Sequence, residues 1–154
     1  MLASSGLTIS LAESSTGGYI GHLLNGLPGS SKYFVGGIVA YHNKPKVSLL
    51  KVPQELLEAE GAVSFHTALA MARGVREALD TDIGVSETGT AGPGGGTPEK
   101  PVGTAFIAIS ARDKYELSER YLWKTDRQGY KDRTAEAVLD LVKHYLARKK
   151  APPL

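Results

Sequence analysis

The chain has 154 residues, no cysteine and a formal net charge of +2, and 42% of its residues are hydrophobic. This length and composition suit one soluble globular domain with a full core, and they exclude an intrinsically disordered chain. The missing cysteines exclude disulfides, thiolate catalysis and cysteine-bound zinc, and the nearly balanced charge with scattered aromatic residues argues against nucleic-acid binding.

The amino terminus and the apolar segments bear on cellular location. The first residues lack the basic start of a signal peptide, and no apolar run approaches the ~18 residues of a membrane span. We therefore expect a cytoplasmic protein without membrane contact.

The first 60 residues contain five predicted elements, recognised by apolar spacing and by the residues that flank them. Pro28 and Gly29 end the first helix, and Asn43 is a suitable N-cap for the second. In chain order the elements are a strand over 7–12, a helix over 20–27, a strand over 36–41, a short helix that begins at Asn43 and a helix over 53–60.

The remainder of the chain contains five more predicted elements. Ser64 is the expected cap of a long helix whose apolar face ends at Leu79, and Asp113-Lys114 suits a hairpin turn. The elements are that helix, strands over 83–86, 103–110 and 117–123, and a final helix over 130–148. Interleaved helices and strands that are apolar on both faces predict one three-layer α/β/α domain over residues 1–150. We expect its sheet to be mixed and largely parallel, and residues 151–154 to form a disordered tail.

Three polar segments, 13–18, 41–46 and 88–103, each follow directly on a predicted strand. In open α/β sheets ligands collect beyond the carboxyl ends of strands, so one shared site is expected. Residues 88–103 hold six of the chain's 18 glycines and three of its eight prolines. This composition favours a ligand-binding loop, and a plain connector is the alternative.

The segment 13–18 links a strand to a helix. Thr16, Gly17 and Gly18 could offer free helical N–H groups to a phosphate or carboxylate, although Thr16 could equally be a simple helix cap. The pattern of a P-loop or of a Rossmann fingerprint is absent. At the start of the last helix, Arg127 could reach a phosphate, while Asp126 could cap the turn.

Ser31, Tyr41 and Lys46 form a further candidate group. A lysine in the first turn of a helix faces the positive end of the helix dipole, which lowers its pKa. A neutral lysine could deprotonate a serine, and a tyrosine hydroxyl could relay the proton. An ordinary surface lysine is the alternative reading of Lys46. The four histidines are dispersed, so no metal site is expected.

With these segments in place, the chain resembles the C-terminal domain of the CinA family. The resemblance is carried by six stretches in the family's order: Ala12-Glu-Ser-Ser-Thr-Gly-Gly18, Pro28-Gly-Ser-Ser31, Tyr41-His-Asn-Lys-Pro-Lys46, Gly61-Ala-Val-Ser64, Thr88-Gly-Thr-Ala-Gly-Pro93 and Lys100-Pro-Val-Gly-Thr104. It extends over about residues 7–148.

The resemblance implies an amidase that converts nicotinamide mononucleotide (NMN) to nicotinate mononucleotide and ammonia. It implies a serine–lysine pair assisted by a tyrosine, and by position these are Ser31, Lys46 and Tyr41. The residues it implies for substrate binding or oxyanion stabilisation are Ser14, Thr16, Gly17, Gly18, Asn43, Thr88, Gly89 and Arg127. We further expect no metal or other cofactor, and a homo-oligomer.

The chain departs from the family's usual pattern at three places. Ser15 stands where the family usually has cysteine, and Thr90 stands where it usually has isoleucine. Family members also carry a helix of about twenty residues before the first strand, and only six residues precede Leu7 here. We expect apolar surface to be exposed as a result.

Two other functions are considered beside the amidase. One is a catalytically silent nucleotide-binding or interaction module linked to competence or DNA-damage responses. The other is a phosphate-ester or pyrophosphate hydrolase, which fits poorly because no cluster of carboxylates for Mg²⁺ stands out.

Overall fold

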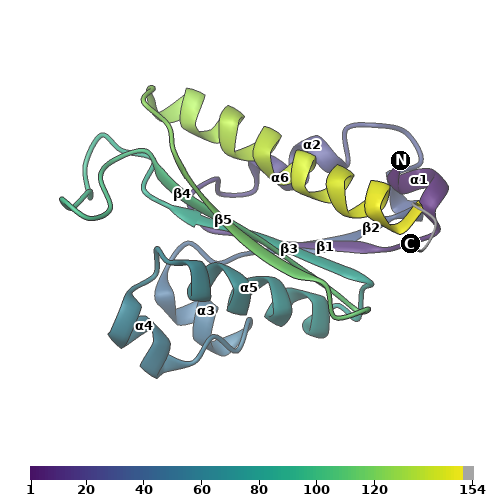
Figure 1. Ribbon diagram of the computed structural model, residues 1–154, viewed down its shortest axis with the longest axis horizontal. Helices are drawn as coiled ribbons and strands as arrows, with labels where there is room; N and C mark the ends of the chain where they lie inside the picture. The colour runs from purple at the N-terminus through teal and green to yellow at the C-terminus, as the bar shows by residue number, and fades with distance from the viewer. Residues whose placement is uncertain (151–154) are drawn as a thin grey trace.

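A computed structural model describes residues 1–150, and the tail expected over 151–154 lies outside the described residues. Five strands form one sheet in the order β2-β1-β3-β4-β5, which lies between two layers of helices (Figure 1). The strands are β1 (Ile9–Glu13), β2 (Phe34–Val39), β3 (Ile83–Gly89), β4 (Thr104–Ala111) and β5 (Glu116–Leu122).

The helices divide between the two faces of the sheet. On one face lie α2 (Tyr19–Leu24) and the long α6 (Arg127–Lys150), with the short α1 (Leu2–Ser5) at the end of the sheet near the carboxyl end of α6 (Figure 1). On the other face lie α3 (Asn43–Ser48), α4 (Gln54–Glu60) and α5 (Phe65–Ala78). The three-layer α/β/α fold expected from the sequence is therefore confirmed.

The sheet is mixed, as expected, but the expectation that it is largely parallel was slightly loose. β1 pairs in parallel with β2 and with β3, whereas the β3–β4 and β4–β5 pairs are antiparallel. The reason is the connection after β3, which returns through the glycine-rich loop without a crossover helix. The β4–β5 hairpin turns at the expected place, where Lys114 has a positive φ of 70° and its N–H donates to Ala111.

Two elements were not predicted from the sequence, α1 and the 3-10 turn η1 (Ser30–Lys32). The predicted strands and helices are all present, with ends shifted by a few residues. The expected N-cap of α5 is also confirmed, since the hydroxyl of Ser64 accepts a hydrogen bond from the Thr67 N–H.

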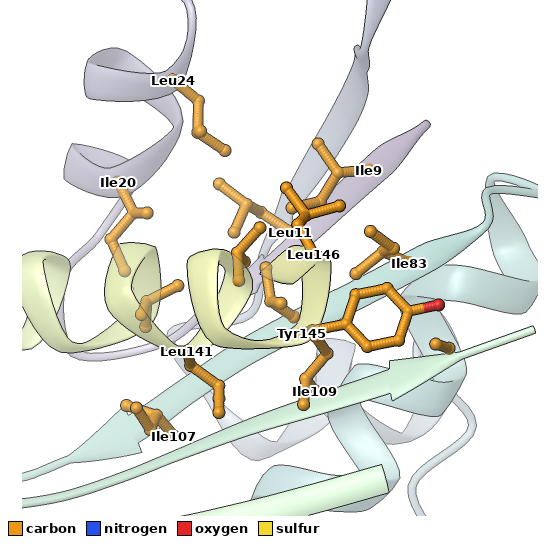
Figure 2. Close-up of a cluster of buried hydrophobic side chains, with 14 of the residues drawn as sticks. Ile9, Leu11, Ile20, Leu24, Ile83, Ile107, Ile109, Leu141, Tyr145 and Leu146 are labelled. Carbon is orange, nitrogen blue, oxygen red and sulfur yellow. The ribbon is translucent and has the colours of Figure 1, made fainter. Parts of the chain in front are cut away.

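The larger core cluster fills the space between the sheet and the α2–α6 layer. Leu141, Tyr145 and Leu146 on α6 belong to this cluster together with Leu11 on β1 and Ile107 and Ile109 on β4 (Figure 2). A second cluster, which includes Met71 and Val75 of α5, packs on the opposite face of the sheet. Burial of apolar surface on both faces fixes the strands whose ends form the site described below.

Some apolar side chains on and near the edge strand β2 are exposed. Val35 and Val39 on the edge strand β2 are 53% and 51% exposed, and Leu27 is 70% exposed. None of the described helices is both long enough and apolar enough to span a membrane.

We predict that Gly74→Ala destabilises the fold. A Cβ added at Gly74 of α5 would lie 1.9 Å from the carbonyl oxygen of Leu50, which is backbone and cannot rotate away. Overpacking of this kind costs about 1–3 kcal/mol, measurable as a lower urea midpoint of unfolding. Gly94→Ala is the matched control, because a Cβ at Gly94 meets nothing within 4 Å. Equal midpoints for the two variants would contradict the close approach of α5 to Leu50.

Candidate active site

The carboxyl ends of the three parallel strands β2, β1 and β3 meet at one edge of the sheet. An open cavity of about 890 Å³ lies there, and its lining includes residues at or just after the carboxyl end of each strand. Ser14 follows β1, Tyr41 and Lys46 follow β2, and Thr88 lies at the end of β3. The shared location expected for the three polar segments is therefore found.

The central contact in this cavity joins Lys46 to Ser14. The Nζ atom of Lys46 lies 3.0 Å from the hydroxyl oxygen of Ser14 and donates to the carbonyl oxygen of Ala40 at 2.7 Å. Lys46 is 1% exposed and Ser14 is 6% exposed. In its neutral form the amine would keep the bond to Ala40 and accept the hydrogen of the Ser14 hydroxyl. A serine whose hydroxyl donates its hydrogen to a neutral lysine amine is activated as a nucleophile.

Burial lowers the pKa of Lys46. Loss of solvent around the ammonium lowers the pKa of Lys46, while the nearby carboxylate of Glu87 acts in the opposite direction and raises it. The net pKa is below the ordinary value. This direction agrees with the sequence-based expectation for Lys46, although the main cause is burial.

The structure does not bring Ser31 to Lys46. Ser31 is exposed within η1, which precedes the amino end of β2, whereas Lys46 follows the carboxyl end of the same strand. The whole length of β2 separates them. This corrects the expected pairing within the chain: the serine that faces Lys46 is Ser14, which the sequence had suggested only as a substrate contact.

Tyr41 lies at the opening of the site and contacts the start of α6. Its hydroxyl accepts a hydrogen bond from an Nη atom of Arg127 at 3.1 Å, and the other Nη donates to the carbonyl oxygen of Gly92. A smaller cavity of about 270 Å³, lined by Ser14, Tyr41, Arg127 and the residues 89–92 and 94, adjoins the first one. Arg127 therefore links the glycine-rich loop to Tyr41 beside Ser14.

Asn43, Thr88 and Gly89 line the larger cavity. The hydroxyl of Thr88 donates to the carbonyl oxygen of Ala62, so Thr88 also fixes the segment before α5. At Gly89 a Cβ would lie 2.0 Å from the Tyr130 hydroxyl oxygen, which requires a residue without a side chain.

Thr16, Gly17 and Gly18 do not form the expected anion site. The carboxylate of Glu13 accepts from the backbone N–H groups of Gly18, Ile20 and Gly21, so the start of α2 already holds an anion. The N–H of Gly17 donates to the carbonyl oxygen of Ser14. Thr16 is 1% exposed and lines neither cavity. We correct this assignment: these residues shape the turn after Ser14.

Glu87 is a buried residue of the site that the sequence analysis missed. It belongs to β3, is 0% exposed, and its carboxyl group accepts from the Ser14 N–H, the Thr16 N–H and the Ser15 hydroxyl. Burial raises the pKa of Glu87. A carboxylic residue within an otherwise uncharged buried strand was the available sequence signal. Among residues 1–150, no group of three or more His, Asp or Glu side chains is placed to hold a metal ion.

The fold and the site define an α/β domain with a buried serine–lysine pair at the carboxyl ends of its parallel strands. Residues 1–146 match the CinA C-terminal domain, and the chain belongs to that family. A competence-damage inducible protein of Moorella thermoacetica is 48% identical over 92% of this chain, and a CinA-like protein of Synechocystis is 54% identical over 84%.

Solved structures carry the same fold. A competence/damage inducible protein from Agrobacterium tumefaciens has a TM-score of 0.88 and 38% identity, covering 90% of this chain and 85% of that one. The chain spans about a third of the curated relatives it matches, 34% of the Moorella protein and 31% of the Synechocystis protein.

Proposed function

We propose that the chain is an amidohydrolase that converts NMN to nicotinate mononucleotide and ammonia. The observation that carries the proposal is the buried Lys46 amine 3.0 Å from the Ser14 hydroxyl, on the lining of an open cavity. Membership of the CinA family supports it, because the family resemblance implies this reaction. The nucleophile in this proposal is Ser14.

The reaction follows from the two side chains. The Ser14 oxygen attacks the carboxamide carbon while its proton passes to the neutral Lys46 amine. The resulting lysine ammonium then gives that proton to the departing nitrogen, the C–N bond breaks, and ammonia leaves an ester on Ser14. Water attacks this ester with Lys46 again as base, which releases the carboxylic acid and restores Ser14. The whole cycle consumes one water and needs no oxidant or reductant.

Arg127 is placed to bind the phosphate group of the nucleotide. Its guanidinium group lies between the carbonyl oxygen of Gly92 and the Tyr41 hydroxyl, on the lining of the smaller cavity beside Ser14. A guanidinium group can bind phosphate through two parallel N–H donors. In this arrangement the nicotinamide ring lies toward Lys46 and the phosphate toward the glycine-rich loop.

We predict that Arg127→Ala raises the KM for NMN by about 10-fold or more, because a charge-assisted bidentate contact contributes more than 1.4 kcal/mol. The KM for nicotinamide riboside, which has no phosphate, should stay the same. Arg133→Ala is the matched control, since Arg133 is exposed on the same helix and lines neither site cavity. An equal rise of KM for both substrates would argue against a phosphate contact.

The function is tested by incubating the purified protein with NMN and measuring ammonia together with nicotinate mononucleotide. Equimolar appearance of both products is expected. Absence of turnover with NMN binding retained in calorimetry would overturn the amidase and favour the silent nucleotide-binding module. Absence of both would overturn the nucleotide as ligand.

A further inference from the structure

Glu87 is fully buried directly behind the Ser14 segment, and the chemistry proposed above leaves it without a role. Its Oε1 atom accepts from the N–H groups of Ser14 and Thr16 and from the Thr16 hydroxyl, and its Oε2 atom accepts from the Ser15 hydroxyl. Four hydrogen bonds from three consecutive residues thus end on one side chain. The backbone on either side of the Ser14 side chain is fixed by this carboxyl group.

The hydroxyl groups around Glu87 supply fewer hydrogens than their contacts require. Thr16 lies 2.6 Å from Glu13 and 2.8 Å from Glu87, and Ser15 lies beside Glu87 and 2.8 Å from the Tyr130 hydroxyl. Three hydroxyls provide three hydrogens for these four contacts. The fourth contact is satisfied when the Glu87 carboxyl group itself carries a hydrogen, and it is lost when Glu87 ionises.

The charge of Glu87 also affects the pKa of Lys46. Glu87 is the carboxylate that opposes the effect of burial on Lys46, and its own burial raises the pKa of Glu87. The other titratable groups around this pair are Glu13 and Tyr130 near Glu87, and Tyr41, His42 and Lys44 on the lining of the cavity beside Lys46. Of these, Glu13 is held by the start of α2.

We infer that Glu87 is a positioning residue for Ser14: its buried carboxyl group fixes the backbone of the segment that carries the nucleophile, directly behind the serine that contacts Lys46. This inference rests on the proposed function for its catalytic meaning. An ionised Glu87 favours the ammonium form, which cannot accept the Ser14 proton. A protonated Glu87 removes that stabilisation and makes the free amine accessible at lower pH.

The coupling is tested directly on Lys46, without substrate. Protein labelled with ¹³C at the lysine ε carbon is titrated by NMR, and the Lys46 signal is identified by its absence in Lys46→Arg. In Glu87→Gln the amide can keep the contacts to Ser14, Ser15 and Thr16 but cannot ionise. Its Lys46 midpoint is expected to fall by at least about one pH unit. Glu87→Asp keeps a charge and is expected to show no such fall.

A second measurement needs no variant at position 87. In the unsubstituted protein, the Lys46 signal should carry an inflection at the pH where the Glu87 carboxyl carbon titrates. A Lys46 midpoint unchanged in Glu87→Gln, or a Lys46 curve without that inflection, overturns the inference.

Measurement of NMN hydrolysis distinguishes a failure of the inference about Glu87 from a failure of the proposed amidase function. If NMN is hydrolysed, the acid limb of the kcat/KM profile is expected to move to lower pH in Glu87→Gln, together with the Lys46 midpoint. A purely structural role for Glu87 would lower kcat and leave the limb in place. If NMN is not hydrolysed but the Lys46 midpoint still falls, the amidase fails while the control of Lys46 by Glu87 stands.

Discussion

Ser14→Ala is expected to lower kcat for ammonia release from NMN by at least about 10³-fold, because the hydroxyl that faces Lys46 is lost. Ser31→Ala is expected to leave kcat unchanged, since Ser31 is exposed before the amino end of β2. The two variants make the same chemical change at two serines of the chain. Both are measured by ammonia release at saturating NMN.

Binding and stability complete this comparison. Ser14→Ala should still bind NMN in calorimetry, because the hydroxyl acts in the chemical step and the phosphate contact is supplied by Arg127. Its unfolding midpoint should stay close to that of the unsubstituted protein, since the backbone N–H of Ser14 keeps its bond to Glu87. The reverse result, an inactive Ser31→Ala and an active Ser14→Ala, would restore the assignment made from sequence. Ser31 would then have to act in a site formed with a second chain.

The place of the site was predictable from the sequence, because it depends on local features. Each strand before a polar segment is short and apolar, and parallel strands place their carboxyl ends at one edge of the sheet. Lys46 was also singled out from the sequence, because a lysine near the start of the predicted short helix stood out, although the structure places Lys46 in the last turn of the six-residue α3.

The partner of Lys46 was not predictable in the same way. Ser14 and Lys46 are 32 positions apart, and their contact depends on how far α3 folds back over the end of β1. No local pattern distinguishes Ser14 from Ser31, since both follow turn-forming or polar residues. The pairing is set by the tertiary arrangement of β1, β2 and α3.

The turn after Ser14 shows a second limit of prediction from the sequence. Free N–H groups at a helix start predict an anion site, and the anion is present as the carboxylate of Glu13. The sequence shows that an anion can bind at this helix start. It does not show whether a side chain of the protein, here Glu13, occupies the N–H groups in place of a ligand. The expectation of a largely parallel sheet was loose for a similar reason, because the sequence of a glycine-rich loop does not show whether the next strand returns antiparallel or crosses over to run parallel.

Lys46→Arg is expected to lower kcat by about 10²–10⁴-fold, the range that general acid–base catalysis contributes. Arginine keeps the positive charge, but its guanidinium group has a pKa above ~12 and cannot accept the Ser14 proton near neutral pH. Lys46→Met, which removes the charge as well, should be equally inactive if proton acceptance is what Lys46 supplies. Lys51→Met is the matched control, because Lys51 is exposed and its amine bonds to the carbonyl oxygen of Ser48.

The hypothesis that Lys46 is the base also predicts the direction in which activity changes with pH. Lysine with its ordinary pKa of ~10.4 is neutral in fewer than ~0.1% of molecules at pH 7, and burial lowers the pKa of Lys46 from that value. The kcat/KM value should therefore rise with pH and level off below the ordinary lysine pKa, as Lys46 loses its proton. A small primary amine added to Lys46→Met should restore part of the rate, more at higher pH. Activity that falls as pH rises through this range, or a Lys46→Arg variant with full activity, would exclude Lys46 as the base and leave it as a fixed charge beside Ser14.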